Sequence, residues 1–278
     1  MIAVTGASGL IGSHLVYALA KKGEKVRALY RNEKHKQNAI SSLMVYPDAK
    51  NILSRVEWHQ ADILDIPLLH DILEDCNRVY HAAALVSFNP KTKHLLYKVN
   101  TVGTANVVNT CLGLGIKELA YVSSVAALGR AQENEPIDEK TEWKDAPDNT
   151  AYAISKHFAE REVWRGIEEG LNVVIVNPCV VLGPTNYKHG SAAIIHKVAQ
   201  GLKYYTKGSN AIVDARDVAS CMITLMEKQI FNQRFVLVGE NLSFKHLFTL
   251  IAKKLGVDAP KKCATARPVS YTHLTLPT

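Results

Sequence analysis

Short apolar runs alternate with longer amphipathic segments through the first two thirds of the chain. The runs have the length and β-branched content of buried strands, and the segments between them have apolar residues at helical spacing. The pattern predicts strands over residues 1–5, 25–30, 55–62, 78–84, 118–124 and 172–178. Helices are expected over 10–23, 66–76 and 94–114, in a polar insertion over 33–54, and around Tyr152. Apolar strands that alternate with helices predict an α/β fold with a doubly wound parallel sheet, covered by helices on both faces.

After Pro184 this alternation becomes less regular. The pattern here predicts helices and one strand, over 190–201, 216–228, 243–255 and 234–239. We therefore expect two domains. The first covers 1–184, with a sheet that is completed by parts of 210–240, and the second is a smaller C-terminal lobe over 185–268.

The last ten residues, Val269–Thr278, do not continue this pattern. Their sequence, VSYTHLTLPT, has no helical period and alternates Tyr, His and Thr. It matches the translation of a sequencing-library adapter, in a frame that also accounts for Pro268. We therefore expect 269–278 to be an artefact of sequence assembly and exclude it from fold reasoning. The natural chain is then expected to continue past Arg267, so that the smaller lobe is truncated here.

Composition and charge narrow the class of protein. The 278 residues are 47% hydrophobic and 21% charged, as in ordinary globular proteins. The net charge of +7 suits anionic ligands, but the lysines and arginines are scattered, which argues against a nucleic-acid partner. The five cysteines form no CxxC pair and the histidines lack metal-ligand spacing, so we expect reduced thiols and no metal site. The N-terminus lacks the charged start of a signal peptide and no apolar run could span a bilayer, so a cytoplasmic protein is expected.

The first strand and the first helix meet at a glycine-rich turn, TGASGLIG, with the spacing GxxGxxG. Glycines at such a junction permit a tight turn, close approach of the backbone to a pyrophosphate, and close packing of helix on strand. The N-terminus of the helix adds free N–H groups and a positive dipole end. The motif therefore predicts a Rossmann-type dinucleotide site. The residues expected to contact the cofactor here are Gly6, Ser8, Gly9, Leu10, Ile11 and Gly12.

The ends of the second and third strands refine this site. Arg31 stands where this fold usually has an acid that binds the ribose 2′-hydroxyl. A guanidinium there can bind a 2′-phosphate, which favours NADP(H) over NAD(H), although Arg31 could also be a solvated surface residue. Asp62, followed by Ile63, could accept a hydrogen bond from the adenine amino group, and its structural alternative is a helix N-cap.

The end of the fourth strand is made of small residues. Ala82, Ala83 and Ala84 follow His81 in the run HAAA. Side chains of this size would let a cofactor lie against the tip of the strand. The sequence therefore extends the predicted cofactor site across a neighbouring strand.

Taken together, these segments resemble the extended short-chain dehydrogenase/reductase family, within the NAD-dependent epimerase/dehydratase superfamily. The resemblance runs from Met1 to about residue 260 and rests on TGxxGxxG, HAAA, VNTVGTANV, VSS before AALG, YxxxK and NPCVVLGP. VRALYR, HAAALVSF and NPCVVLGP look most like the dihydroflavonol-reductase-like and 3β-hydroxysteroid-dehydrogenase-like branch. The insertion over 33–54 is longer than most members carry. Members usually have further elements that close the substrate lobe, which again implies that the lobe is incomplete here.

The resemblance gives a role to Tyr152 and Lys156, which lie one helical turn apart. In a nicotinamide enzyme, a proton must reach or leave the substrate oxygen as hydride moves at carbon. Free tyrosine titrates at about 10, and an adjacent ammonium and a positive nicotinamide ring both lower that pKa. We therefore predict that Tyr152 is the acid/base, and that Lys156 lowers its pKa and binds the nicotinamide ribose. The alternative is an amphipathic helix with an ordinary Tyr–Lys pair.

A serine completes the predicted triad. By resemblance, Ser124 at the end of the fifth strand donates a hydrogen bond to the same substrate oxygen. Ser123 is the rival, but the serine of the family stands five positions before the glycine of the following segment, and Gly129 selects Ser124.

The resemblance adds further cofactor contacts. Asn100 is expected to order the cofactor region, with helix capping as the alternative. Pro178 and Val181 resemble residues that pack against the nicotinamide carboxamide, and Ser123 is counted among the cofactor contacts.

We therefore expect an NAD(P)-dependent oxidoreductase that interconverts a ketone and a secondary alcohol on a small, fairly apolar substrate. NADP(H) is favoured as cofactor, with NAD(H) possible. One alternative is a nucleotide-sugar epimerase or dehydratase with tightly bound NAD, although VSSVAALG lacks the residues typical of those enzymes. The other is a non-catalytic NADP-sensing module, which would typically lose the Tyr/Lys pair. The expected partner is a small-molecule substrate, without nucleic acid or a membrane span, and a homodimer is possible.

Overall fold

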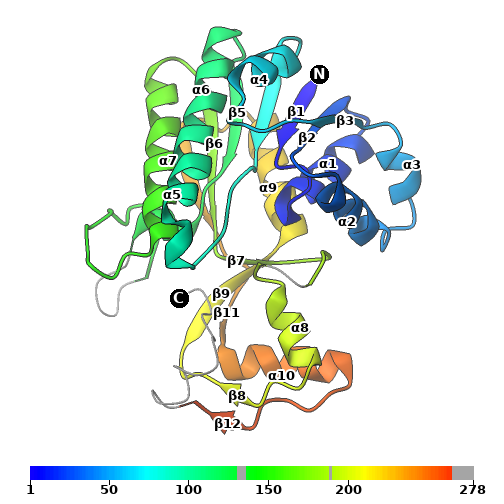
Figure 1. Ribbon diagram of the computed structural model, residues 1–278, viewed down its shortest axis with the longest axis vertical. Helices are drawn as coiled ribbons and strands as arrows, with labels where there is room; N and C mark the ends of the chain where they lie inside the picture. Colours follow the sequence, from blue (N-terminus) through cyan, green and yellow to red (C-terminus); the bar gives the residue numbers. More distant parts are fainter. Residues whose placement is uncertain (130–135, 188–189, 265–278) are drawn as a thin grey trace.

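The computed structural model describes residues 1–129, 136–187 and 190–264, so the predicted artefact over 269–278 lies outside the described residues. The described chain contains a seven-stranded sheet in the order β10-β6-β5-β4-β1-β2-β3, in which every neighbouring pair is parallel (Figure 1). The predicted doubly wound α/β fold is confirmed. The strands are β1 (Ile2–Thr5), β2 (Val26–Tyr30), β3 (Glu57–Gln60), β4 (Arg78–His81), β5 (Glu118–Val122), β6 (Asn172–Pro178) and β10 (Gln233–Leu237).

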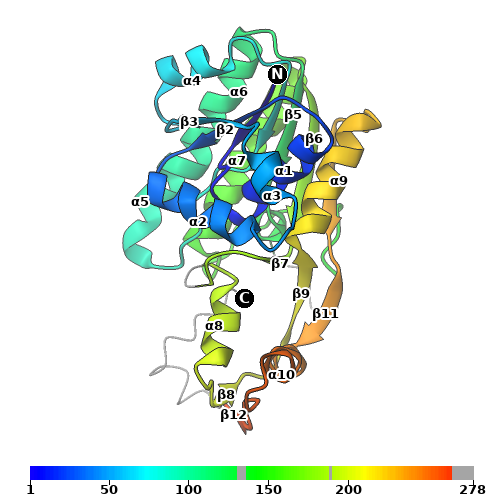
Figure 2. The same ribbon diagram turned by 90° about the vertical axis from the view of Figure 1, so that its right-hand side faces the viewer.

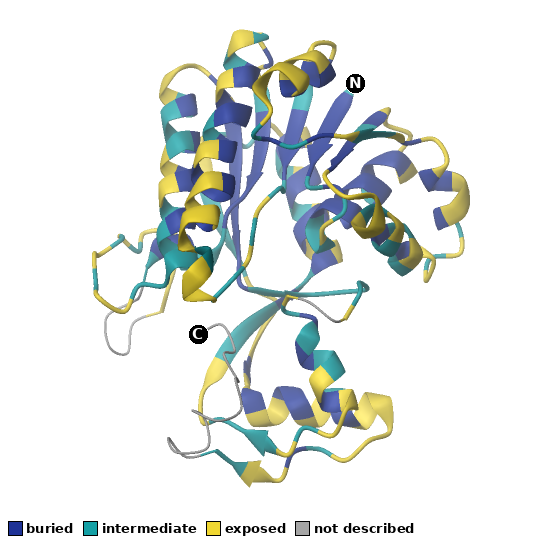
Figure 3. Cartoon of the chain, in the orientation of Figure 1, coloured by how far each residue is buried: buried dark blue, intermediate teal, exposed yellow. Residues whose placement is uncertain are grey.

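Helices cover both faces of this sheet, one layer on each side of it in Figure 1, and Figure 2 looks onto the side of α1 and α3. One face packs against α1 (Leu10–Lys21), α2 (Glu33–Leu43), α3 (Ala49–Leu53) and α9 (Ala215–Glu227). The other face packs against α4 (Ile66–Leu73), α6 (Gly103–Gly113) and α7 (Ala151–Glu168). The inner strands are buried along their length, which explains why their sequence is apolar at consecutive positions (Figure 3).

The predicted helix over 94–114 is built from three consecutive segments. These are α5 (Lys93–Leu96), a π-helical segment (Tyr97–Val102), and α6. Such wide turns are rare and often occur at functional sites. Here the π-helical segment contains Asn100 and is followed by Gly103, where an added Cβ would lie 2.5 Å from the Ile63 side chain. The sequence pattern did not reveal this local widening, because its apolar spacing is close to that of an α-helix.

The smaller C-terminal lobe lies beyond the carboxyl ends of the parallel strands (Figure 1). It contains a three-stranded sheet and two helices around a separate apolar cluster. Its elements are β7 (Val180–Leu182), α8 (Ala193–Ala199), β8 (Tyr204–Tyr205), β9 (Ser209–Asp214), β11 (Glu240–Ser243), α10 (Phe244–Leu255) and β12 (Lys262–Cys263). Between β9 and β11 the chain returns through α9 and β10 to the main sheet. Among the described helices, none is both long enough and apolar enough to cross a membrane.

Candidate functional site

The glycine-rich turn joins β1 to α1 with almost no space between backbone segments. Gly6 has a φ of +67°, and a Cβ added to it would lie 2.5 Å from the backbone nitrogen of Ala83. A Cβ added to Gly12 would lie 2.1 Å from the carbonyl oxygen of Gly6. Since backbone atoms cannot move aside as a flexible side chain can, both positions require glycine.

The N-terminus of α1 fits the phosphate-binding role that the sequence predicts. Its N-cap, Gly9, provides no side chain to bond the first N–H groups of the helix. These donors and the positive end of the helix dipole therefore remain for an anionic ligand. Ser8, Leu10 and Ile11 are partly exposed on the same turn, and Gly9 is exposed. The turn can hold a pyrophosphate through its backbone.

The ends of the neighbouring strands border this turn. Arg31 is exposed immediately after β2. Asp62 accepts a hydrogen bond from the Leu64 backbone N–H at 3.0 Å, whereas Asp65 caps α4. The helix-capping alternative for Asp62 is therefore wrong. A hollow of about 540 Å³ lies beside Asp62, and its lining residues are Asp62, Leu64, Asp65, Ile66, Pro67 and Lys98.

The alanines after β4 pack against the glycine turn. Ala82 donates its backbone N–H to the carbonyl of Thr5 at 3.2 Å, and Ala83 donates to the Thr5 hydroxyl at 3.3 Å. Ala82 and Ala83 are partly buried, and Ala84 is exposed. The small residues therefore allow the close contact with Gly6, in addition to the role in cofactor access that the sequence predicts.

Tyr152 and Ser124 meet at the carboxyl end of β5. Thr150 caps α7 by accepting from the Ala153 N–H at 3.1 Å, so Tyr152 stands in the first turn of the helix. Its ring contacts Phe88 edge-on at 5.7 Å between centroids, and the nearby Ser124 hydroxyl accepts from the Ala126 backbone N–H at 3.2 Å. Burial raises the pKa of Tyr152, and the Ser124 side chain acts in the opposite direction. The fold thus brings the predicted serine and tyrosine near each other at the end of β5.

Lys156 is on the same helix but its ammonium has other partners. The side chain is 2% exposed, and Nζ donates to the Tyr121 hydroxyl at 2.6 Å and to the Val122 carbonyl at 2.8 Å. Burial lowers the pKa of Lys156 to about 7, while the Glu160 carboxylate acts in the opposite direction. The prediction that Lys156 lowers the pKa of Tyr152 is not met in this arrangement, because the ammonium turns toward β5 and burial dominates at Tyr152.

Asn100 links the cofactor side of the sheet to α7. Its side chain accepts from the Leu85 N–H at 2.7 Å and donates to the Leu85 carbonyl at 3.0 Å and to the Ser155 hydroxyl at 2.9 Å. It lies inside the π-helical segment, so the helix-capping alternative is wrong. By fixing Leu85, Asn100 orders the segment that carries Phe88 toward Tyr152.

The remaining predicted residues lie at the ends of neighbouring strands. Pro178 is the last residue of β6, and Val181 is partly buried in β7. Ser123 donates its hydroxyl to Glu160 at 2.5 Å. The hydroxyl of Ser123 is thus engaged away from Tyr152, and Ser124 is the serine whose side chain acts on the pKa of Tyr152.

Sequence reasoning missed a group of buried polar side chains, Thr5, His81 and Thr104, next to the Tyr121 ring. His81 is fully buried, with its two ring nitrogens 2.6 Å from the Thr5 hydroxyl and 3.0 Å from the Thr104 hydroxyl. Its ring stacks on Tyr121, and burial lowers its pKa to about 3, so it is neutral near pH 7. Only its position before the alanine run drew attention to it. No group of three or more metal-binding side chains occurs in the described parts of the chain.

Comparison with known proteins identifies the family. The model of the NAD dependent epimerase/dehydratase family matches residues 2–239. The chain belongs to this family. Its fold and its glycine turn agree with that assignment, and the predicted enzyme class, an NAD(P)-dependent oxidoreductase of the extended short-chain dehydrogenase/reductase type, is confirmed.

Individual relatives are reductases by name. Cinnamoyl-CoA reductase 1 of Petunia hybrida is 30% identical over 95% of this chain and 80% of its own length. A Synechocystis protein provisionally named dihydroflavonol 4-reductase is 29% identical over 93% of this chain and 73% of its own length. The crystal structure of gox2253 superposes with a TM-score of 0.84 at 29% identity, covering 97% of this chain and 79% of that one. These similarities agree with the branch of the family that the sequence motifs indicate.

Proposed function

We propose that this chain reduces a ketone on a small, fairly apolar molecule to a secondary alcohol, or catalyses the reverse reaction, with Ser124, Tyr152 and Lys156 as its catalytic residues. The observation that carries the proposal is the packing of α7 on the carboxyl end of β5: Lys156 Nζ donates to the Val122 carbonyl at 2.8 Å, two residues before Ser124, and the Ser124 side chain acts on the pKa of Tyr152. Ligands bind at this end of the strands in open α/β sheets.

The roles follow from the chemistry of each side chain. A bound nicotinamide cofactor would supply or accept the hydride. The Tyr152 hydroxyl donates a proton to the substrate oxygen during reduction, and Ser124 donates a hydrogen bond that stabilises negative charge on that oxygen. Lys156 binds the nicotinamide ribose. Its amine titrates near neutral pH, which suits a residue that changes partners during turnover.

Two features support an apolar substrate and NADP(H). Phe88 packs against Tyr152, and Val86 on the same segment is 55% exposed. At the end of β2, Glu33 is the nearest acid to Arg31 along the chain, but its carboxylate accepts from Lys36 and Gln37. A carboxylate that is paired with a cation repels a 2′-phosphate less than an unpaired one. The exposed Arg31 can therefore bind the phosphate.

The test is NADPH consumption with a panel of apolar ketones and aldehydes. Tyr152→Phe and Ser124→Ala should lower kcat by at least about 100-fold while the Kd of NADPH stays within a few-fold, because these groups handle the proton and not the cofactor. Tyr97→Phe, which removes a hydroxyl from an exposed tyrosine, is the control and should retain activity. Substantial turnover in Tyr152→Phe would remove Tyr152 as the acid/base.

The same preparation distinguishes the alternatives. Purified protein that binds added NADPH and oxidises it with a carbonyl compound supports the reductase. Purified protein that retains unexchangeable NAD and interconverts nucleotide sugars would instead show an epimerase. Cofactor binding without turnover on either panel would favour a sensing module.

A further inference from the structure

Glu160 is a buried carboxylate to which the proposed reaction assigns no part. It is 3% exposed and lies on α7. Oε2 accepts from the Ser123 hydroxyl at 2.5 Å and from the Asn177 amide at 2.8 Å. Oε1 accepts from the Trp164 indole N–H at 3.3 Å and from the Arg234 guanidinium at 3.2 Å. A buried charge needs such partners, and here they come from β6, β10, α7 itself and the end of β5.

Two of these partners hold the backbone on which the proposed catalytic serine stands. The amide of Asn177 that binds Glu160 also donates to the carbonyl oxygen of Ser124 at 3.0 Å. The hydroxyl of Ser123 is bound to the same carboxylate oxygen. The side chain of Ser123 and the backbone carbonyl of Ser124 are therefore both held in place, while the Ser124 hydroxyl accepts from the Ala126 backbone N–H at 3.2 Å and acts on the pKa of Tyr152.

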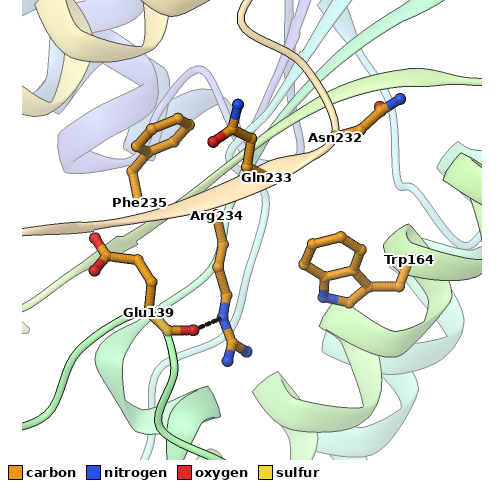
Figure 4. A pocket seen from close by; sticks show the side chains of 6 residues that line it. All are labelled: Glu139, Trp164, Asn232, Gln233, Arg234 and Phe235. Atoms are coloured by element: carbon orange, nitrogen blue, oxygen red, sulfur yellow. Dashed lines mark hydrogen bonds between the residues drawn. The ribbon is translucent and has the colours of Figure 1, made fainter.

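Arg234 holds the carboxylate from the outermost strand of the sheet. Besides Glu160, its guanidinium donates to the carbonyl of Glu139 at 2.9 Å (Figure 4) and to the carbonyl of Thr141 at 3.0 Å. The segment with these carbonyls leads to Thr150, the N-cap of α7. One side chain thus connects β10, the segment before α7 and the buried face of α7. It borders an open groove of about 670 Å³, which is lined by Glu139, Trp164, Asn232, Gln233, Arg234 and Phe235.

We infer that Glu160 is a positioning residue of the reaction proposed above: held by Arg234, it fixes the Ser123–Ser124 turn and places a negative charge beside Lys156. Mutually restrained hydrogen-bond partners hold a donor in one geometry, which matters because small misplacements of a catalytic group lower rates strongly. The activity readouts of this inference rest on the proposed function, and its structural readout does not.

The charge of Glu160 acts on Lys156 across one helical turn. The titratable groups around Lys156 are Tyr121, His81, Tyr152 and Glu160, and Glu160 is the carboxyl group among them. Glu160 raises the pKa of Lys156, against the lowering by burial to about 7. Removing the carboxylate should therefore lower the Lys156 pKa further.

The experiment compares Glu160→Gln with Glu162→Gln, a charge loss on the same helix at a carboxylate that pairs with Arg165 near the surface. Glu160→Gln should lower kcat by about tenfold or more and leave the KM for NADPH within a few-fold. The variant Lys156→Met identifies the part of the kcat pH profile that is due to Lys156, because that part is lost in it. This part of the profile should move to lower pH in Glu160→Gln and stay in place in Glu162→Gln. Unchanged kcat and pH profile in Glu160→Gln, or equal effects of both variants, would overturn the inference.

A second measurement does not depend on turnover. Amide hydrogen exchange over residues 122–126 should be faster in Glu160→Gln, and also in the smaller change Ser123→Ala, than in wild type or Glu162→Gln. If wild type reduces no carbonyl compound, the proposed function fails, and this measurement still decides the positioning role. Unchanged exchange in folded Glu160→Gln protein would refute that role.

Discussion

The glycine turn and the inner face of α7 both belong to the proposed site, but they are built in opposite ways. In the turn, the functional groups are backbone N–H donors, and Gly6, Gly9 and Gly12 matter because they lack side chains. On α7, the proposed functional groups are the side chains of Tyr152 and Lys156, and the hydrogen-bond partners of Lys156 come from β5.

This difference affects how each region responds to change. A backbone site is rigid and tolerates no added atom, since the surrounding atoms are themselves backbone. The face of α7 instead holds a buried lysine, Lys156. Replacing this lysine by an apolar residue should make the folded protein more stable. Functional residues of this kind often reduce stability. Substitutions in the two regions should therefore have opposite effects on stability, although both reduce function.

Lys156→Met should have the largest effect on activity. Turnover should fall by on the order of 100-fold or more, because the ribose-binding amine is lost. At neutral pH the free energy of unfolding should instead rise, since a buried lysine with a lowered pKa disfavours folding. Parallel kinetic and denaturant-unfolding measurements check both, and lower stability of the variant at pH 7 would contradict the expected contrast.

The pH dependence sharpens this prediction. The pKa of Lys156 is about 7 in the folded chain and 10.5 as the reference value, so between these values the unfolded chain binds more protons. Wild-type stability should therefore rise with pH through this window, and Lys156→Met should lose that rise. Lys117→Met, at an exposed position, is the control and should keep it.

Gly12→Ala tests the other region. The added Cβ would lie 2.1 Å from the Gly6 carbonyl oxygen, so the turn or the helix must shift. We expect a loss of about 3 kcal/mol in stability and ~100-fold weaker NADPH binding, as for overpacking at a tight contact. Gly113→Ala in α6 is the matched control, because a Cβ there meets no atom within 4 Å. Equal behaviour of the two variants in thermal unfolding and cofactor titration would contradict the rigid-turn account.

Arg31→Asp should have a smaller effect and should act only on cofactor choice. Losing a charge-assisted phosphate contact costs about 1.5–3 kcal/mol, so NADPH affinity should fall tenfold to a hundredfold relative to NADH. Stability should hardly change, since Arg31 is exposed. Titration with both cofactors measures the ratio, and equal wild-type affinity for NADH and NADPH would show that Arg31 is a bystander.

The sequence alone determined the features that depend on local spacing. Alternating apolar runs and amphipathic segments indicated the parallel sheet, and the glycines at the first strand–helix junction indicated the phosphate-binding turn. The one-turn spacing of Tyr152 and Lys156 placed both on one face of a helix. These inferences succeed because helix period, strand period and glycine stereochemistry involve few neighbouring residues.

Only the tertiary structure decided which side chains meet across the sheet. In the folded chain, Lys156 donates a hydrogen bond to Tyr121 and not to Tyr152. Glu160 accepts hydrogen bonds from Ser123, Asn177 and Arg234. The tertiary structure also widened the helix at Asn100 so that this side chain reaches Leu85. Such contacts join residues far apart in the chain. Which of them form depends on strand order, on register and on how deeply each polar group is buried, and no local pattern in the sequence carries that information.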